Sequence, residues 1–476
     1  MVMVMESIKG ISGLSRTQVL QLFFFSLLGA ILALHAFLPY FKTHKIVSLA
    51  VTWCVAVSVA LYLYKRPRTV YLLDYNCYKP PREQRCSFEA CEYFLRRSKR
   101  FSMESENFMK GIYRRSGLGD ETYAPPFIFQ KNYDARLTSS IEEAEDGMFS
   151  SVDALLVKTG VPVEKIDTLI VTCGLFAPSP SPSSFLVNRY GFTPAIKSFN
   201  IGGMGCASGG MAIDLATRIL SSSRQVRYAL VVVTESISLN WYFGANRSML
   251  VTNCIFRAGC AAVLLTNDPS CRRIAKMELL RTLRTHCGAD DDSYTAAYQM
   301  EDEEGKQGVA LKKDLIRVAG EGLKQHMKIL GVRVLPITQI ILYVYNNMIS
   351  YLSRETTKPY VPDFTTAFDH VCMHAGGKAV IQSVGKLMKL PDELTEPARM
   401  TLHRFGNTSS SLILYELAYF EAKARINKGD KIWMLAFGTG FKVCSLVWRS
   451  LQNSPETPSI DNPWDDSIHR YPMKTW

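Results

Sequence analysis

SFNIGGMGCASGG, residues 198–210, is the stretch that decides the fold. A short β-type lead-in runs into glycines, then into Cys206, and an apolar pattern of helical spacing follows through Met211, Leu215 and Ile219. Glycines in front of a helix let the backbone turn sharply and approach a ligand closely. The stretch therefore predicts a strand, a tight turn and a helix, with Cys206 at the start of the helix.

The position of Cys206 allows two interpretations. Unpaired N–H groups and the helix dipole favour an anion at a helix start, so the thiol pKa falls and the sulfur becomes a nucleophile. The alternative is a small buried cysteine packed beside glycines, which is the common role of a lone cysteine in an intracellular protein. The rest of the sequence has to decide between these two interpretations.

Length and composition narrow the protein class. A chain of 476 residues can bury a large core, and its 55 Lys and Arg residues outnumber its 43 Asp and Glu residues. A basic balance suits a membrane surface, a nucleic acid or the phosphates of a coenzyme. The basic residues are dispersed and form no nucleic-acid-binding motif, so we expect no nucleic acid. The one cysteine cluster, Cys77, Cys86 and Cys91, fits no zinc spacing, and we expect reduced thiols in a cytosol-facing protein.

Two apolar runs near the amino terminus predict a membrane hairpin. Residues 19–41 and residues 46–64 carry no formal charge, and each run is about long enough to cross a bilayer. The alternative, a pair of buried core helices, is uncommon for such runs at a chain end. Lysine and arginine flank the pair on both sides, which places the tail, residues 1–18, and the following chain in the cytosol.

The remaining chain shows a repeat in outline. In the first half, residues 131–320, three apolar strands surround the Cys206 helix, at 168–172, 229–234 and 261–266. In the second half, residues 321–451, strands are expected at 340–345, 432–437 and 443–448. A membrane-proximal linker, 65–130, precedes the two halves, and a polar tail, 452–476, follows them.

Cys206 and Asn407 occupy the same place in this repeat, each just before a helix. Two α/β halves that pack their cores together would bring both helix starts to one central site.

Four histidines stand near glycines or turns: His286, His370, His374 and His403. Each alone is typical of a hydrogen-bonded structural histidine. His370 and His374 are four residues apart and would share one face of a helix, but no carboxylate follows at zincin spacing, so we expect no metal. A cysteine, a histidine and an asparagine at glycine-flanked helix starts suit acyl transfer, with the thiolate as nucleophile and the other two as donors to an oxyanion. Hydrolysis would use the same groups, so these residues alone do not settle the reaction.

Longer motifs extend beyond these single residues. They read CYKPP at 77–81, GMGC at 203–206, NRSMLVTNC at 246–254, HAGG at 374–377, HRFGNTSSS at 403–411 and NPW at 462–464. Together they resemble the plant 3-ketoacyl-CoA synthases, the membrane-bound condensing enzymes of very-long-chain fatty acid elongation. These enzymes are similar to type III polyketide synthases. The resemblance implies the α/β thiolase-like fold, a five-layered αβαβα arrangement of two pseudo-repeated halves, here preceded by the membrane hairpin.

The resemblance also implies a site and a reaction. It assigns a catalytic triad of Cys206, His374 and Asn407, and it places His286, His370 and His403 on the family's other active-site histidines. A long-chain acyl-CoA would transfer its chain to Cys206. Malonyl-CoA would then lose CO2, and its enolate would attack the acyl thioester to give a 3-ketoacyl-CoA that is two carbons longer. No metal or redox cofactor is required.

The same resemblance predicts the setting of the enzyme. We expect a multi-pass protein of the endoplasmic reticulum membrane, with its catalytic domain facing the cytosol, in contact with membrane lipid. The expected partners are the other elongase subunits, namely the reductases and the dehydratase, and a second copy of the chain in a homodimer. Two alternatives stay open, a condensing enzyme of the type III polyketide synthase kind and a weakly active scaffold subunit of an elongase complex. Small departures from the family pattern, such as Ala207, Ser208 and Cys287, remove no catalytic group.

Overall fold

The computed structural model describes residues 53–56, 67–131, 133, 135–353, 360–457 and 459–474. The chain divides into two compact units, Met1–Arg68 with Met327–Pro362, and Thr69–His326 with Asp363–Trp476. The second unit holds every strand of the described chain, together with Cys206, His374 and Asn407.

Within the described residues, nine strands join in one mixed sheet of order β3-β2-β4-β5-β1-β6-β11-β10-β9. Their bounds are β1 (Tyr71–Cys77), β2 (Ile166–Cys173), β3 (Lys197–Gly202), β4 (Tyr228–Glu235), β5 (Gly259–Thr266), β6 (Met277–His286), β9 (His370–Met373), β10 (Lys431–Gly438) and β11 (Lys442–Ser450). β7 (Ala297–Glu301) and β8 (Gln307–Leu311) form a separate hairpin. β1 pairs with β6 only at Tyr71 and Leu72, so the sheet consists of two parts that meet at this narrow join.

The two parts of the sheet repeat one topology. In the first part β2 and β4 are parallel, β4 and β5 are antiparallel, and β1 lies antiparallel beside β5. In the second part β9 and β10 are parallel, β10 and β11 are antiparallel, and β6 lies antiparallel beside β11. The edge strand β3 has no counterpart beside β9 among the described residues. The predicted repeat of two α/β halves is therefore present, with one strand fewer in the second half.

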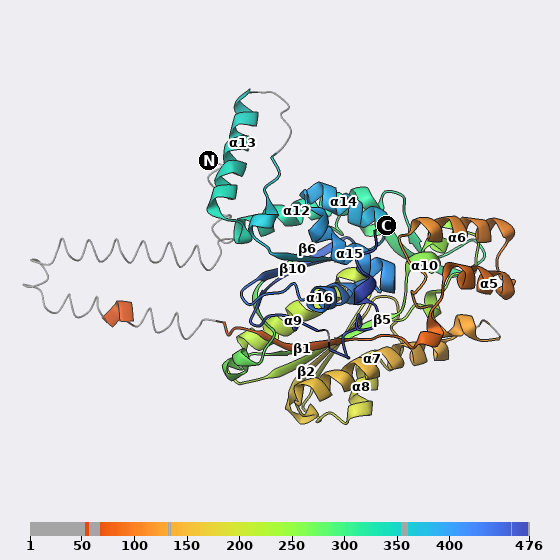
Figure 1. The fold of residues 1–476 in the computed structure, drawn as a ribbon, viewed down its shortest axis with the longest axis horizontal. Helices are drawn as coiled ribbons and strands as arrows, with labels where there is room; N and C mark the ends of the chain where they lie inside the picture. Colours follow the sequence, from red (N-terminus) through yellow and green to blue (C-terminus); the bar gives the residue numbers. More distant parts are fainter. Residues whose placement is uncertain are drawn as a thin grey trace, which may run out of the picture. The chain divides into compact units, whose positions relative to one another are not determined.

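Helices cover both faces of each part of the sheet (Figure 1). α7 (Leu137–Thr159) and α8 (Pro182–Tyr190) cover the outer face of the first part, and α9 (Ser208–Ser222) and α16 (Leu412–Ala422) lie between the two parts. Successive strand residues point to opposite faces, and accordingly Ile170 packs in the central layer whereas Leu169 packs under α7. α12 (Leu315–Val334) and α14 (Lys378–Met388) lie over the second part, which completes five alternating layers.

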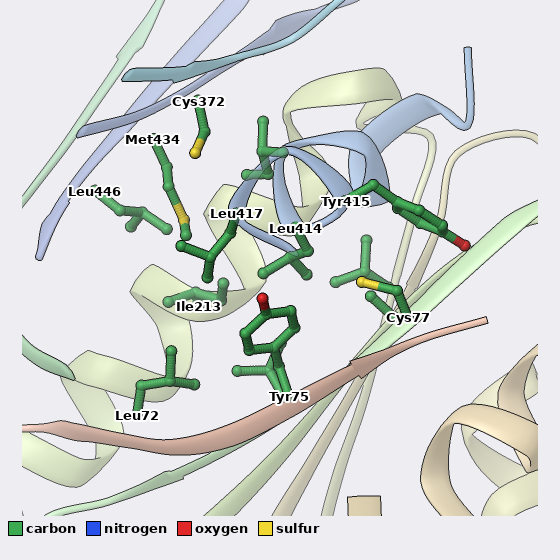
Figure 2. Packing of buried hydrophobic residues seen from close by; sticks show 14 of the residues in the cluster. Leu72, Tyr75, Cys77, Ile213, Cys372, Leu414, Tyr415, Leu417, Met434 and Leu446 are labelled. Carbon is green, nitrogen blue, oxygen red and sulfur yellow. The ribbon is translucent and has the colours of Figure 1, made fainter. Parts of the chain in front are cut away.

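The central layer is the main core of the molecule. Figure 2 shows Leu414 and Leu417 of α16 packed with Ile213 of α9, between Leu72 of β1 and Met434 of β10. Burying each such side chain stabilises the fold by about 1.5–3 kcal/mol. α16 is buried around nearly its whole circumference, including Glu416, which is the pattern of a helix that is surrounded by protein.

The remaining helices and turns belong to the second unit, except α13, which belongs to the first. The other α-helices are α5 (Phe88–Ser98), α6 (Met103–Arg115), α10 (Arg247–Ile255), α11 (Asp291–Thr295), α13 (Ile337–Ser353) and α15 (Asp392–Phe405). Short 3-10 turns are η1 (Arg82–Gln84), η2 (Pro126–Phe129), η3 (Val163–Lys165), η4 (Gly205–Ala207), η5 (Ser238–Asn240), η6 (Pro269–Arg273), η7 (Phe364–Thr366), η8 (Ser409–Ser411) and η9 (Ile468–Arg470). η4 and η8 each lead directly into a helix of the central layer.

The strand expected at 340–345 is wrong, because these residues belong to the helix α13. A short apolar run does not distinguish a buried strand from a helix by its periodicity, and here the uninterrupted helix is 17 residues long. The strand that begins the second repeat is instead β9. It is only four residues long, starts at His370 and is followed directly by His374. β1 lies inside the expected linker, 65–130, and β6 belongs to the second sheet part although it falls within residues 131–320.

The predicted membrane runs, 19–41 and 46–64, lie outside the described residues except for residues 53–56, which are helical. Among the helices that the structure describes, we find none with the length and apolar character needed to cross a bilayer.

Candidate active site

Cys206, His374 and Asn407 line one cavity of about 320 Å³. They come from three separate places in the chain: Cys206 from η4, His374 from the end of β9, and Asn407 from the turn between α15 and η8. Apolar side chains make up most of the remaining wall, among them Phe256, Leu315, Leu323, Val384 and Phe437. The structure thus brings together the cysteine, the histidine and the asparagine that the sequence predicted, in a mostly apolar pocket.

Glycines fix the turn that carries Cys206. Gly205 adopts a left-handed φ of 58°, and a Cβ there would collide with Thr439. A Cβ on Gly438, at the end of β10, would lie 2.6 Å from the backbone N of Cys206. Only glycine permits both the backbone angle and the close approach. The end of β10 therefore packs directly against the backbone of Cys206 and fixes its position.

Ser409 links Cys206 to a buried carboxyl group. Its hydroxyl donates to Cys206 Sγ at 3.5 Å, and it also interacts with the side chain of Glu235. Glu235 stands at the end of β4 and accepts hydrogen bonds from the backbone N–H groups of Gly174, at 3.2 Å, and Leu175, at 2.9 Å. Burial raises the pKa of this carboxyl above its ordinary value. The hydrogen bonds from Leu175, Ser409 and Gly174 oppose this rise, so the carboxyl and the nucleophile share Ser409 as a neighbour.

The thiol of Cys206 is not acidic in this site. Burial raises its pKa to about 12, opposed by the hydrogen bond from Ser409 and reinforced by the nearby Glu235. The expectation of a lowered pKa at the helix start is therefore wrong. Desolvation of the sulfur in an apolar pocket outweighs the favourable field of a helix that begins two residues later.

His374 is neutral in the same pocket. Its backbone N–H donates to the carbonyl of Leu435 at 2.9 Å, which ties it to β10. Its ring meets the ring of Phe437 edge-on, with centroids 5.3 Å apart and planes at 82°. Burial lowers the pKa of the imidazole to about 4, and a hydrogen bond that the ring donates to the backbone carbonyl of Ser409 opposes this shift. Nδ1 is buried without a hydrogen-bond partner among the described residues, and burial outweighs the interaction with Ser409, so the ring is neutral.

Backbone and side-chain bonds hold Asn407 in one orientation. Its N–H donates to Ile255 O at 3.1 Å, and its carbonyl accepts from the N–H of Arg257 at 2.9 Å. Its Oδ1 accepts the Ser409 N–H at 2.8 Å, which turns Nδ2 toward the carbonyl of Gly376, 3.3 Å away. The donor side of the amide therefore lies on the His374 side of the cavity, where an oxyanion could be bound.

The other three predicted histidines do not line this cavity. His370 begins β9, and its Nε2 lies 2.9 Å from Asp430 Oδ2. Four residues of extended strand span about 13 Å, so His370 and His374 stand apart and do not share a helix face as expected. His286 is exposed at the end of β6, where its Nδ1 accepts from the Gly288 N–H at 2.9 Å. His403 in α15 bonds through Nδ1 to the hydroxyl of Tyr471 at 3.0 Å. A catalytic role for these three stays a prediction.

The structure also revises the position that pairs with Cys206 in the repeat. η4 and η8 are both three residues long, and each is followed at once by a helix of the central layer. Gly205 and Ser409, the first residues of the two turns, share a φ of 58°. The counterpart of Cys206 is therefore Ser410, and Asn407 lies three residues before it. The sequence alone favoured Asn407 as the counterpart, because a glycine directly precedes Asn407 as Gly205 precedes Cys206. The backbone angles instead match Cys206 with Ser410.

Two residues at the site were missed by the sequence analysis. Ser409 belongs to a run of three serines that shows no preference for one of them. Glu235 carried a usable signal, because it is an acidic residue directly after six buried apolar or small positions of β4. A carboxyl group at the end of a fully buried strand needs hydrogen-bond partners. Here one of those partners is Ser409, which also donates to Cys206 Sγ.

Comparison with known proteins places the chain in a family. Residues 62–352 match the family model described as FAE1/Type III polyketide synthase-like protein, and residues 365–450 match the 3-oxoacyl-[acyl-carrier-protein] synthase III C-terminal model. The chain is 46% identical over 428 residues to 3-ketoacyl-CoA synthase 17 of Arabidopsis thaliana, covering 89% of this chain and 86% of that protein. It is 45% identical over 424 residues to probable 3-ketoacyl-CoA synthase 20 of Oryza sativa subsp. japonica, covering 88% of this chain and 81% of that protein.

A solved structure supports the fold independently. The crystal structure of the fungal type III polyketide synthase ORAS superposes with a TM-score of 0.61 at 17% identity, covering 80% of this chain and 99% of that one. At that identity the similarity concerns the fold alone, and it agrees with the predicted thiolase-like arrangement. Sequence identity and the two family models together show that the chain belongs to the 3-ketoacyl-CoA synthase family of acyltransferase-type condensing enzymes.

Proposed function

We propose that this chain condenses a long-chain acyl-CoA with malonyl-CoA to a 3-ketoacyl-CoA, CoA and CO2, the condensation step of very-long-chain fatty acid elongation. The observation that carries the proposal is the meeting of Cys206, His374 and Asn407 in one mostly apolar cavity. An apolar pocket accepts an acyl chain, and the cysteine, histidine and asparagine are the groups that acyl transfer requires.

The first stage acylates Cys206. The thiol and the imidazole are both neutral at rest, so attack on the acyl thioester moves the thiol proton to His374 as the S–C bond forms. Ser409 donates to the sulfur and stabilises its developing negative charge. The tetrahedral intermediate then collapses, CoA leaves as its thiolate, and His374 returns the proton to it. The acyl chain remains on Cys206.

The second stage forms the carbon–carbon bond. Malonyl-CoA breaks its bond to the carboxylate and releases CO2, and the electron pair passes into an enolate. Donors from His374 and Asn407 Nδ2 stabilise the enolate oxygen. The apolar wall favours loss of the poorly hydrated carboxylate. The enolate carbon attacks the acyl carbonyl, Cys206 leaves as a thiolate, and a proton restores its thiol.

A label experiment tests both stages. Trypsin releases Cys206 in the peptide 198–218, so incubation of the full chain with a labelled long-chain acyl-CoA should add one acyl group to that peptide. Addition of malonyl-CoA should discharge it as a single 3-ketoacyl-CoA. His374→Ala should abolish the release of CO2 from malonyl-CoA, whereas Asn407→Asp should lower it by placing an acceptor where a donor is needed.

Three results would overturn the proposal. Products of several successive condensations would favour a polyketide synthase. Unchanged very-long-chain products from Cys206→Ala in a host that lacks them would favour a scaffold subunit. An acyl group that remains on the protein in Cys206→Ala would exclude the acyl-Cys206 intermediate.

We also propose that residues 19–41 and 46–64 anchor the enzyme in the endoplasmic reticulum membrane with its catalytic unit in the cytosol, where acyl-CoA and the reductase and dehydratase subunits would meet it. Their lack of formal charge supports two membrane spans, and the Lys and Arg residues that flank the pair on both sides support this orientation. Protease digestion of sealed microsomes should degrade the catalytic unit, and its survival would refute the topology. We expect a homodimer, which chemical crosslinking of the membrane fraction would detect as a doubled mass.

A further inference from the structure

Two thiols meet in a part of the molecule that the condensation does not use. Cys86 Sγ and Cys91 Sγ lie 2.9 Å apart, compared with about 2.05 Å in a disulfide bond. Cys86 is fully buried, and Cys91 is partly exposed in the first turn of α5. The backbone holds the pair in place, because the Cys91 N–H donates to Ser87 O at 2.9 Å and the Cys86 N–H donates to Thr122 O at 2.8 Å.

A buried guanidinium supplies positive charge beside the pair. Arg257 is 2% exposed, and its Nη1 donates to the carbonyls of Cys254 and Phe256. Among the described residues no carboxylate oxygen lies within 4.0 Å of it. The groups whose charge acts on it are Tyr113, Cys91 and Cys86, and of these Cys91 is the one whose pKa is lowered. The hydrogen bond from Cys86, followed by the charge of Arg257, lowers the pKa of Cys91 against the opposing effect of burial, whereas the same bond and burial raise the pKa of Cys86.

A small cavity gives access to Cys91. Its volume is about 40 Å³, and its wall includes Cys91, Phe94, Tyr113 and Arg257. A cavity of about 10–15 Å³ on this measure holds one water, so this one admits a molecule of the size of hydrogen peroxide. A partly exposed thiol with thiolate character, beside a second thiol that can resolve it, is the arrangement that reacts reversibly with oxidants.

We propose that Cys86 and Cys91 form a redox modification site, a dithiol that hydroperoxides oxidise to an intrachain disulfide and that dithiol reductants restore. The Cys91 sulfur attacks the hydroperoxide, the O–O bond breaks, and the leaving oxygen takes a proton to become water or an alcohol. Cys91 is then a sulfenic acid. Cys86 gives up its proton and attacks that sulfur, the S–O bond breaks, and water leaves. Two thiols lose two electrons in total, and the hydroperoxide gains them.

The dithiol is connected to the turn that carries Asn407. The Arg257 N–H donates to Asn407 O at 2.9 Å, and a Cβ on Gly406 would collide with Cγ of Arg257. Arg257 Nε also lies 3.4 Å from Thr122 Oγ1, in the residue whose carbonyl holds Cys86. Disulfide formation removes the thiolate that compensates Arg257. The oxidised enzyme should therefore condense more slowly, by about threefold to tenfold, which is within the range of coupling between linked sites.

Mass spectrometry of the full chain in membranes tests the modification. Trypsin cleaves after Arg85 and Arg96, so both thiols fall in the single peptide 86–96. Hydrogen peroxide should lower the mass of this peptide by two hydrogens and block its alkylation, and dithiothreitol should reverse both changes. Cys91→Ser should abolish the mass change. Cys254→Ser is the matched control, because Cys254 lines the same cavity but burial raises its pKa to about 12, and this variant should still form the disulfide.

The peptide 198–218 in the same digest reports whether Cys206 itself has been oxidised, so that activity is compared only between samples in which it is intact. Reversible loss of activity in the parent chain and its absence in Cys91→Ser would support the link through Arg257. An unchanged peptide 86–96 at a peroxide dose that oxidises Cys206 would overturn the dithiol. Full activity with the disulfide formed would overturn the link to Asn407.

Discussion

The turns η4 and η8 share the same backbone conformation, but their side chains have different chemical roles. Both are three-residue 3-10 turns that open a helix of the central layer, and both begin with a residue at φ 58°. In η4 this residue is Gly205, which pays no steric penalty, whereas in η8 it is Ser409. A side chain at that angle costs roughly 1–3 kcal/mol and persists where its surroundings require it. The strain at Ser409 accompanies its hydroxyl bond to Cys206.

The second position of each turn differs more. Cys206 opens onto the cavity, whereas Ser410 is buried, and its hydroxyl has no hydrogen-bond partner among the described residues. One turn thus supplies the attacking atom. The other supplies what surrounds that atom, namely Ser409 beside the sulfur and Asn407 just before the turn. The comparison teaches that a repeated fold provides two equivalent helix starts, and that only one of them needs to carry the nucleophile.

The strongest way to break this comparison is Cys206→Ser, which places a hydroxyl at the second position of both turns. We expect condensation to fall by at least about a thousandfold, because a hydroxyl is far less acidic than a thiol and His374 has no described carboxylate partner to strengthen it as a base. Product formation from labelled acyl-CoA and malonyl-CoA measures the loss. Cys287→Ser, at a partly exposed thiol outside the cavity, is the control and should keep its activity. Comparable losses in both variants would contradict the assignment of the nucleophile.

Gly438→Ala should have the next largest effect. The added Cβ would lie 2.6 Å from the backbone N of Cys206, so the turn η4 has to move although no reacting group is changed. A displacement of about 1 Å at a reacting atom costs on the order of a hundredfold in rate. Acylation of the peptide 198–218 with time measures it. Gly377→Ala is the matched control, because a Cβ there meets nothing within 4 Å. A fully active Gly438→Ala would mean that β10 does not set the position of Cys206.

The pH dependence of alkylation sharpens the comparison between Cys206 and Cys91. With its pKa raised to about 12, Cys206 should react with iodoacetamide about tenfold faster per pH unit from pH 6 to pH 9, without levelling off. Cys91, whose pKa is lowered by the hydrogen bond from Cys86, should level off at a lower pH than Cys206. Mass spectrometry of the two tryptic peptides gives both rates from one sample. A plateau for Cys206 near pH 8 would show that the resting site holds a thiolate, in contradiction to the neutral pair.

Variants of Ser409 test whether the turn η8 contributes to the reactivity of Cys206 in η4. Ser409→Gly removes the hydroxyl that donates to Cys206 Sγ and also removes the backbone strain at φ 58°. We expect acylation to slow by about tenfold, the equivalent of one hydrogen bond of about 1.4 kcal/mol to a charged sulfur. Ser409→Ala should slow acylation equally but unfold more readily than Ser409→Gly, by about 1 kcal/mol, because alanine keeps the strain. Unchanged acylation in both variants would remove Ser409 from the chemistry.

Much of the fold and the centre of the site could be predicted from the sequence. Apolar strands such as β2 and β4 are continuous, and the glycines around Cys206 allow little other than a tight turn. Tertiary context decided the rest. α13 is as apolar as a buried strand, and β9 is too short to give a periodic signal. The distances that separate these histidines from the cavity depend on the strand ends that His370 and His286 occupy and on the helix α15 that holds His403. That placement requires the topology of the sheet.

Electrostatics was the least predictable part of the site. A helix start argues for an acidic thiol, and the sequence contains nothing that measures how deeply the sulfur is buried. The pKa of Cys206 rises because its sulfur is buried, and the cavity that it lines is walled by residues such as Phe256 and Phe437, more than 45 positions away in the chain. Ser409 and Glu235 influence the sulfur through the same packing.

Ser410→Ala is the smallest change that still separates the two turns. Ser410 is the backbone counterpart of Cys206, but its buried hydroxyl has no hydrogen-bond partner among the described residues. Removing an unpaired buried hydroxyl relieves a desolvation cost, so the free energy of unfolding should rise by about 1 kcal/mol. The half-life of thermal inactivation should lengthen, while acylation stays within about twofold of the parent chain, since small changes away from reacting atoms have little effect on rate. A loss of acylation as large as that of Ser409→Gly would mean that the second turn acts on Cys206 through both of its serines, and that the division of chemistry between the turns is less strict than their hydrogen bonds indicate.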